Sequence, residues 1–577
     1  MRRPVKYGIL GGITMSFLAG IGMVESFADR MLIDPVLNMG YLVLYGIVAV
    51  YGNMAARSEP NPLEEPSYEK GSSALAGLMT GLIAGLGAAI FVVLVDSVDM
   101  TRYFPNFRPE LVEVMTFGLE LIPGLVALIA VSGAAGAVGA VVLGLEASRR
   151  HRVAATVGWV LGFALFQVVV TDILDIAPAL ARVFYAPLGG LEWYMAVIIG
   201  AVAYFLSGRS KGKAKSVIET VRTAERWSGV RWSVYAFAGI ALLLPWLVLG
   251  GIVNELLINV FLYVLMGLGL NIVVGYAGLL DLGYVAFFAV GAYGTALLTS
   301  SLSPTVTPEL SWWVALPFVV GLAAIAGLLV GTPVIRMRGD YLAIVTLGFG
   351  EIVRILLLSD WLVPYFGGSQ GIRQIPGIQV GPWEVSGVDP QYFVYFAAFF
   401  AGLAAFISYR AQNSRVGRAW AAMREDEDVA EAIGVSTVKA KLLAFITGAV
   451  VASFAGALFS AKVGAVFTNS FDVLVSLIIL VVVIVGGMGS IPGVILGAFV
   501  LIGILGGPKS PGLLAEFSEY KLLVYGALLI YMMLKRPEGL WPSARRSREL
   551  HADELTQDAW LDKGGDFVSD GEQGAPA

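Results

Sequence analysis

The chain has 577 residues, of which 57% are hydrophobic and 14% are charged, and its formal net charge at pH 7 is −5. This apolar content exceeds what the core of a water-soluble protein needs, and it supplies many runs long enough to span a bilayer. The absence of cysteine excludes disulfides and thiolate chemistry, and the presence of only two histidines argues against a histidine-based metal site. We therefore predict an all-α polytopic membrane protein that itself binds no metal and no cofactor.

The first part of the chain contains six apolar segments, near 8–26, 35–54, 73–95, 117–145, 153–171 and 191–207. Basic residues lie at the start of the chain and in every second loop, whereas the loops between them are acidic or neutral. Because basic loops stay in the cytoplasm, this alternation predicts three helical hairpins that begin and end there. We predict a six-helix membrane bundle over residues 1–208.

A basic polar linker over residues 209–231 separates this bundle from a second one over 232–542. The second bundle offers ten apolar segments, near 233–252, 255–274, 280–300, 312–333, 340–358, 391–409, 441–461, 473–487, 491–506 and 520–534. The total is about 16 transmembrane or re-entrant helices, and whether 473–506 spans or is re-entrant stays open. The protein is predicted to lie in the cell (plasma or inner) membrane, with both termini in the cytoplasm. The acidic tail 543–577 is predicted to be disordered.

Two glycine-rich breaks interrupt the apolar sequence of the second bundle. The first contains Gly275 and Gly278, and the second contains Gly486, Gly487 and Gly489. Irregular backbone at membrane depth is tolerated where it is buried in protein or lines a water-filled path, and in transporters such breaks point to the substrate route. The alternative is that these glycines only allow helices to cross closely.

Polar side chains inside apolar segments are costly, so they are candidates for function. Glu351 and Arg354 can pair at i and i+3 on one helix face, which makes a structural ion pair an equally good explanation for them. The candidate residues of a translocation path are Asn271, Asp281, Tyr284, Thr346 and Glu351.

A charged insert over residues 410–440 lies between two apolar segments of the second bundle. Its arginines place it in the cytoplasm, and its middle predicts a short amphipathic helix that Gly434 ends at the C′ position. The predicted apolar face consists of Ala419, Ala422, Met423, Ala430 and Ile433. We interpret this insert as a docking site for a partner, with a solvated connector as the alternative.

Several runs of the second bundle resemble, in family order over roughly residues 230–542, the permeases of branched-chain amino acid ABC importers, in particular the LivM type. The runs lie at 275–293, 336–354, 367–372, 486–490 and 535–542. The resemblance implies that 430–434 is a loop of the Glu-Ala-Ala type that docks a short helix onto an ATP-binding subunit. The coupling residues would then be Arg424, Glu425, Asp426, Glu431, Ala432 and Gly434.

The same resemblance implies the partners of the chain. They are a second related permease, two ATP-binding subunits that carry ATP and Mg²⁺, an external substrate-binding protein and the lipid bilayer, with no nucleic acid. The chain has no G-x-x-x-x-G-K-[ST] phosphate loop, so it is predicted to be a transport subunit and not the ATPase or another enzyme.

Other questions remain open at this level. The solute could be leucine, isoleucine or valine, or another amino acid, urea or a short amide, and the permease pair could be homo- or heterodimeric. The bundle over 1–208 carries no family motif. An ion-coupled secondary transporter using Asp281 or Glu351 is the alternative function.

Overall fold

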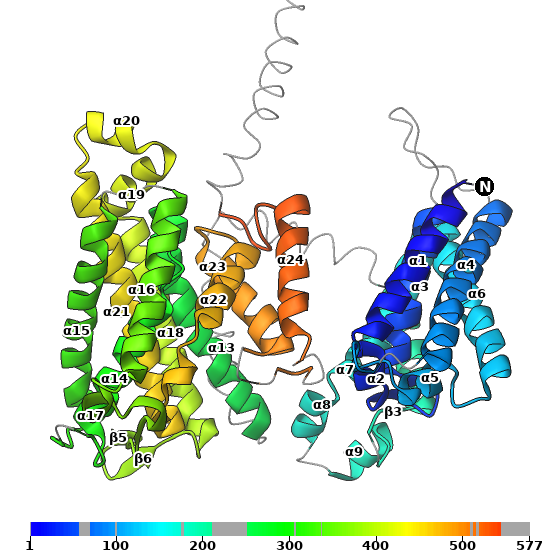
Figure 1. Ribbon diagram of the computed structural model, residues 1–577, viewed down its shortest axis with the longest axis horizontal. Helices are drawn as coiled ribbons and strands as arrows, with labels where there is room; N and C mark the ends of the chain where they lie inside the picture. Colours follow the sequence, from blue (N-terminus) through cyan, green and yellow to red (C-terminus); the bar gives the residue numbers. More distant parts are fainter. Residues whose placement is uncertain are drawn as a thin grey trace, which may run out of the picture. The chain divides into compact units, whose positions relative to one another are not determined.

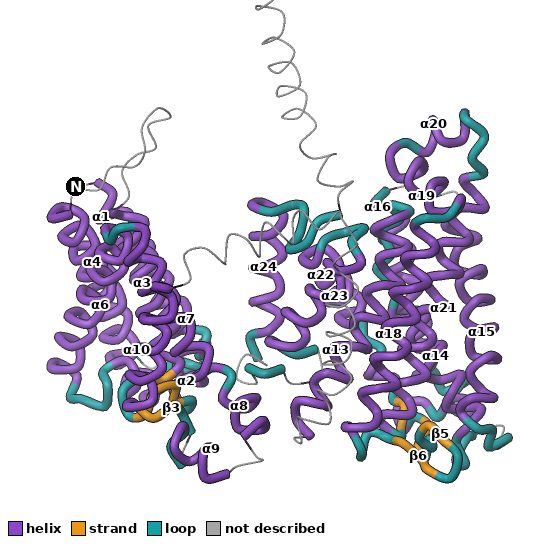
Figure 2. Tube along the Cα trace, turned by 180° about the vertical axis from the view of Figure 1, so that it is seen from behind, coloured by secondary structure: helices purple, strands orange, loops and turns teal. Residues whose placement is uncertain are grey.

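A computed structural model describes residues 2–56, 70–98, 101–174, 178–187, 189–209, 251–304, 307–335, 337, 339–507, 510, 512–514 and 519–543. The chain forms two compact units, Met1–Gly239 and Ile240–Ala577 (Figure 1). Figure 2 shows that helices make up most of the described chain, with only short strands, so the predicted all-α membrane architecture is confirmed. The predicted linker beyond Arg209 and the predicted tail beyond Ser543 lie outside the described residues.

The first unit is a helical bundle in which α1, α3, α4 and α6 pack on one another. Its elements are α1 (Arg2–Gly20), α2 (Met23–Ala28), β1 (Met31–Asp34), β2 (Leu37–Asn38), α3 (Met39–Ala56), α4 (Lys70–Ser97), α5 (Pro109–Met115), α6 (Leu121–Gly144), α7 (Ala147–Leu165), α8 (Gln167–Leu174), α9 (Pro178–Phe184), β3 (Leu191–Glu192) and α10 (Trp193–Arg209). The three strands form a small sheet in the order β2-β1-β3, with β1 antiparallel to β2 and parallel to β3.

The predicted single segment over 153–171 is wrong, because the chain breaks at Phe166 between α7 and α8. At this break the guanidinium of Arg30 donates a hydrogen bond of 2.7 Å to the carbonyl of Leu165. A carbonyl at a helix end needs such a partner, so Arg30 stabilises the break.

The second unit is built around two long, largely buried helices, α13 and α21. Its elements are α13 (Gly251–Leu270), the π-helix η1 (Asn271–Tyr276), α14 (Val285–Thr299), α15 (Trp312–Val334), α16 (Asp340–Leu358), α17 (Val363–Phe366), η2 (Gly368–Gln370), β4 (Ile372–Arg373), β5 (Ile378–Val380), β6 (Trp383–Val385), α18 (Pro390–Gln412), α19 (Arg415–Glu425), α20 (Glu427–Ala432), α21 (Thr437–Val463), β7 (Ala465–Val466), η3 (Thr468–Ser470), α22 (Val473–Gly486), α23 (Ile491–Ala498), the π-helix η4 (Phe499–Leu505) and α24 (Lys521–Lys535). Strand β4 pairs with β7 and β5 with β6. Within this unit, α19 and α20 lie at one end of the bundle, and β5, β6 and α17 lie at the other (Figure 1).

Among the described residues, nine helices are long and apolar enough to cross a membrane, so the predicted total of about 16 is not confirmed. Three belong to the first unit and six to the second. Three further apolar helices are shorter, at Trp193–Ser207, Val285–Thr299 and Ile491–Leu505. The segment predicted near 473–487 extends into a span over Thr468–Gly486, because only Phe471 and Asp472 separate η3 from α22.

Close contact between α14 and α21 depends on small residues. A Cβ atom at Gly456 would lie 2.3 Å from the carbonyl oxygen of Phe288 and 2.6 Å from the backbone nitrogen of Ala292. In a bilayer, helices associate through such close packing, because lipid tails are as apolar as the helices themselves.

We expect Gly456→Ala to destabilise the protein by about 1–3 kcal/mol, because the new methyl group overlaps backbone atoms that cannot rotate away. The matched control is Gly402→Ala on α18, where no atom lies within 4 Å of the new Cβ. Alanine favours a helix over glycine by about 1 kcal/mol, so the control should melt at the parent temperature or slightly above it. Thermal melting followed by size-exclusion chromatography measures both; equal midpoints for the two variants would contradict the packing role.

Candidate functional site

The charged insert folds as two short helices, α19 and α20. We call residues 415–434 the coupling segment, after the role predicted for them from the sequence. The prediction of one helix is wrong, because Asp426 breaks it: its carboxylate accepts hydrogen bonds from the backbone N–H groups of Asp428 (2.9 Å) and Val429 (3.0 Å). A carboxylate in this position caps the N-terminus of a new helix. Ser414 caps α19 in the same way, by accepting from the N–H of Gly417 at 3.2 Å. Asp426 therefore ends α19 and begins α20.

The tip of the coupling segment ends as predicted, with Gly434 at C′ in the left-handed region (φ +90°). The N–H of Gly434 donates to Glu431 O at 2.9 Å and that of Val435 to Ala430 O at 3.0 Å, which is a Schellman motif. Ile433 was predicted on the apolar face of the helix, and this prediction is wrong: its side chain is 70% exposed. The reason is that Ile433 follows the last helical residue, Ala432.

Exposed apolar and acidic side chains thus share the tip. Val429 is 56% exposed, and Glu431, Ala432 and Asp428 are also exposed. Glu425, at the end of α19, is exposed as well. A small apolar surface with an acidic rim is the composition expected of a docking surface.

The base of the coupling segment is fixed to α21. The indole N–H of Trp420, only 1% exposed, donates to the carbonyl of Ala440 at 2.8 Å. The ammonium of Lys441, whose side chain is also 1% exposed, lies 2.7 Å from a carboxylate oxygen of Glu427. These two contacts hold the base of the segment against the start of α21.

Arg424, in the last turn of α19, connects the coupling segment to the first glycine break. Its Nη1 donates a hydrogen bond of 2.7 Å to the carbonyl of Gly275 in η1. A Cβ at Gly278 would lie 2.5 Å from Cγ of Arg424, and Gly278 itself has φ +73°, so this position requires glycine on both grounds.

The two glycine breaks meet each other, although they are far apart in sequence. Oδ1 of Asn271 accepts a hydrogen bond of 2.8 Å from the N–H of Gly489. Asn271 is fully buried, and its Nδ2 has no hydrogen-bond partner among the described residues. It also begins the π-helical stretch, a kind of distortion that is frequent at functional sites. Arg424, Gly275, Asn271 and Gly489 thus join the coupling segment to both breaks.

The second break is also covered by the run that follows α24. The N–H of Trp541 donates to the carbonyl of Gly486 at 3.0 Å, and that of Leu540 to Val485 O at 2.8 Å. Gly487 has φ +126°, and a Cβ there would lie 2.7 Å from the carbonyl oxygen of Trp541. These contacts make the break a defined structure and not a loose loop.

Three of the predicted path residues, Asp281, Tyr284 and Thr346, lie around the turn that leads into α14. Asp281 (1% exposed) accepts from the N–H of Gly283 at 2.9 Å, and Oγ1 of Thr346 accepts from the N–H of Leu282 at 3.1 Å. The hydroxyl of Tyr284 donates to the carbonyl of Gly448 on α21 at 3.0 Å. The hydrogen bonds of these three side chains thus stabilise the backbone at the start of α14.

Glu351, the remaining predicted path residue, forms an ion pair with Arg354 on α16. Nε of Arg354 lies 3.0 Å from Oε2 of Glu351, and the side chains of Glu351 and Arg354 are 34% and 29% exposed. This geometry favours the structural ion pair over a buried coupling carboxylate.

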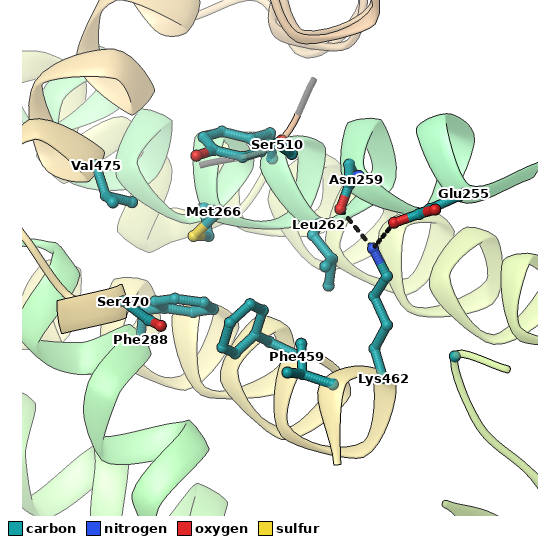
Figure 3. A pocket seen from close by; sticks show the side chains of 13 residues that line it. Glu255, Asn259, Leu262, Met266, Phe288, Phe459, Lys462, Ser470, Val475 and Ser510 are labelled. Atoms are coloured by element: carbon teal, nitrogen blue, oxygen red, sulfur yellow. Dashed lines mark hydrogen bonds and ion pairs between the residues drawn. The ribbon is translucent and has the colours of Figure 1, made fainter. Parts of the chain in front are cut away.

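Sequence reasoning did not single out a polar group at the other end of the bundle, opposite the coupling segment. Glu255 and Asn259 on α13 and Lys462 on α21 stand at the edge of a cavity of about 440 Å³ (Figure 3). The signal was available, because Glu255 begins one predicted apolar segment and Lys462 directly follows another, and ionisable groups within or beside such segments are candidates for function. Within the described ranges, no three His, Cys, Asp or Glu side chains converge as a metal site would need.

Comparison with known proteins gives a consistent result. Residues 252–533 match the family model for the permease component of branched-chain amino acid transport systems. The high-affinity branched-chain amino acid permease LivM of Escherichia coli is 39% identical over 388 residues, which cover 62% of this chain and 88% of that protein. LivM of Salmonella typhimurium is 42% identical, over 54% of this chain and 75% of that protein. LivH of Salmonella typhimurium is 26% identical over 291 residues, which cover 48% of this chain and 90% of that protein. No solved structure is significantly similar to the chain.

Proposed function

The chain belongs to the LivM-type family of branched-chain amino acid transport permeases, and from this premise we propose that it forms part of the membrane path of an ATP-driven importer. As a member of that family it is a multi-pass membrane permease and not an enzyme. The proposed solutes are leucine, isoleucine and valine. ATP and Mg²⁺ would bind to separate subunits, and this chain would bind no cofactor.

The observation that carries the proposal is the connection from the exposed coupling segment to the bundle interior. Docking of an ATP-binding subunit would bury the apolar tip around Ile433 and Gly434. Closure of the ATP-binding subunits would then displace α20, and Trp420 and Lys441 would transmit the displacement to α21. The hydrogen bond from Arg424 to Gly275 would carry it to the two glycine breaks.

The remaining subunits follow from the same premise. The relatives include permeases of two names, LivM and LivH, which favours a heterodimer of this chain with a related permease. An external binding protein would deliver solute at the end of the bundle formed by β5, β6 and α17. The coupling segment and both termini would lie in the cytoplasm. The first unit precedes the matched residues 252–533 and would contact lipid or the partner permease.

The alternative, an ion-coupled secondary transporter, has one observation in its favour. Asp281 is a buried carboxylate, and its Oδ2 has no hydrogen-bond partner among the described residues. A transporter of that class would work without any ATP-binding subunit, so a single experiment separates the two.

The test is reconstitution of the chain with the products of its neighbouring genes in proteoliposomes. We expect co-purification with ATP-binding subunits, and ATP hydrolysis and leucine uptake that both increase with leucine-loaded binding protein. A chain that purifies alone and takes up solute under an ion gradient without ATP would overturn the proposal in favour of the alternative.

A further inference from the structure

The cavity at the end of the bundle opposite the coupling segment has two chemically different parts. Its edge carries Lys462, Glu255 and Asn259, whereas its wall is mostly apolar, with the hydroxyl-bearing Tyr263, Ser470 and Ser510 among the lining residues. The wall residues that argue for its chemistry are Leu262 and Met266 on α13, Phe288 on α14, Phe459 on α21 and Val475 on α22 (Figure 3). Its volume of about 440 Å³ falls in the range of roughly 300–1,000 Å³ that small-molecule sites occupy.

The charged group at the edge is held loosely. Nζ of Lys462 lies 2.7 Å from Oδ1 of Asn259 but 3.7 Å from Oε1 of Glu255, which is longer than a hydrogen bond. The side chain of Lys462 is only 11% exposed, whereas that of Glu255 is 62% exposed. A largely buried ammonium next to an exposed carboxylate offers one positive and one negative group to a ligand that enters between them.

We propose that this cavity is a binding subsite for a zwitterionic α-amino acid with a branched aliphatic side chain. Lys462 binds the α-carboxylate, Glu255 and Oδ1 of Asn259 accept hydrogen bonds from the α-ammonium, and the aliphatic side chain fills the apolar part. The inference rests on the proposed function and adds to it a site in the permease itself.

The chemistry of the cavity selects this ligand class. A largely buried cation with one neutral hydrogen-bond partner and one longer ion pair favours a ligand carboxylate, since charge-assisted hydrogen bonds in a partly dry site are strong. The carboxylate of Glu255 disfavours a simple fatty acid, which would bring negative charge without an ammonium. The mostly apolar wall favours an aliphatic side chain over a charged one, because burying a second charge away from Lys462 and Glu255 would cost more than the hydroxyl groups of Ser470 and Ser510 regain.

The position of the cavity connects it to the coupling segment. Glu255 and Asn271 are sixteen residues apart on the continuous α13–η1 helix, about 24 Å at 1.5 Å per residue. One end of this helix carries the ligand groups, and the other accepts the hydrogen bonds from Arg424 and Gly489. Movement of α13 would therefore change the distance between Lys462 and Glu255 and release the ligand.

The experiment measures equilibrium binding of radiolabelled leucine to the assembled complex in nanodiscs, without ATP and without the binding protein. Competition with 3-methylbutylamine, which lacks the carboxylate, and with 4-methyl-2-oxopentanoate, which lacks the ammonium, separates the two charged contacts. We expect Lys462→Met to weaken leucine binding about tenfold or more and to leave the amine unaffected. We expect Glu255→Gln to weaken leucine and to leave the oxo acid unaffected.

Charge-matched controls are Lys6→Met and Glu110→Gln, two exposed residues of the first unit that should leave binding unchanged. If the complex with Lys462→Met does not assemble, Lys462→Gln takes its place. Glutamine removes the charge but retains an N–H donor for Oδ1 of Asn259. Equal loss of leucine and both analogues, unchanged leucine affinity in the variants, or no leucine binding by the parent complex would each overturn the subsite. In all three cases ATP-driven leucine uptake by the parent complex would leave the proposed function standing, whereas its absence would contradict that function itself.

Discussion

Replacing Arg424 with methionine should reduce ATP-driven leucine uptake about 10- to 100-fold while the complex still assembles and hydrolyses ATP. The guanidinium donates at 2.7 Å to the carbonyl of Gly275, and hydrogen bonds to charged groups contribute about 1.5–3 kcal/mol. Methionine keeps much of the apolar stem but leaves that carbonyl without this donor. The coupling segment would then move without displacing the π-helical stretch η1, so hydrolysis and transport would separate.

The controls for this prediction lie on the same helix. Arg415→Met removes an equal charge from an exposed position at the start of α19 and should transport normally. Arg424→Lys keeps one donor without the planar geometry and should fall between the parent and the methionine variant. Parallel loss of ATP hydrolysis and uptake in Arg424→Met, with normal assembly, would contradict a role in transmission and indicate a role in docking.

Much of the architecture could be predicted from the sequence, because membrane helices depend on local composition. Apolar runs and basic loops gave the helical bundles, and glycine clusters marked both breaks. The C′ position of Gly434 followed from one residue type that tolerates a left-handed backbone. The ordered family motifs then pointed to the LivM-type permeases, which the comparisons confirm.

The contacts that join these parts could not be predicted, because they depend on tertiary packing. Asn271 and Gly489 are separated by 218 residues, Arg424 and Gly275 by 149, and Lys462 and Asn259 by 203. Nothing in the local pattern of either partner identifies the other. Arg424 was singled out for its place in the docking loop, but its hydrogen bond is directed into the bundle.

The coupling segment shows how a local signal can be misread. The run Arg424–Asp428 is highly charged, so it fits the solvent face of one helix. Asp426 instead uses its carboxylate to cap α20, which divides the segment and turns Ile433 toward solvent. An aspartate can lie inside a helix or cap the N-terminus of a new one, and the local sequence allows both. Here the contacts of Trp420 and Lys441 between the segment and α21 favour the capping position.

Gly434→Arg should uncouple the complex, with leucine uptake about 100-fold lower and much less ATP-binding subunit retained on purification. A Cβ at this position meets no atom within 4 Å, so the arginine side chain extends from the exposed tip without disturbing the bundle. There it would occupy the space where the proposed partner contacts Ile433. Loss of a central contact of this kind costs about 2–4 kcal/mol of binding free energy.

Backbone strain is the competing explanation, because any L-residue at φ +90° costs about 1–2 kcal/mol. Gly434→Ala carries the same strain without bulk or charge, and Gly434→Asn carries less, since asparagine tolerates the left-handed region. If obstruction of the tip is the cause, both variants should retain the ATP-binding subunits and most of the uptake. Uncoupling by Gly434→Ala as severe as that by Gly434→Arg would instead assign the effect to the helix cap, and normal transport by Gly434→Arg would place the docking surface elsewhere.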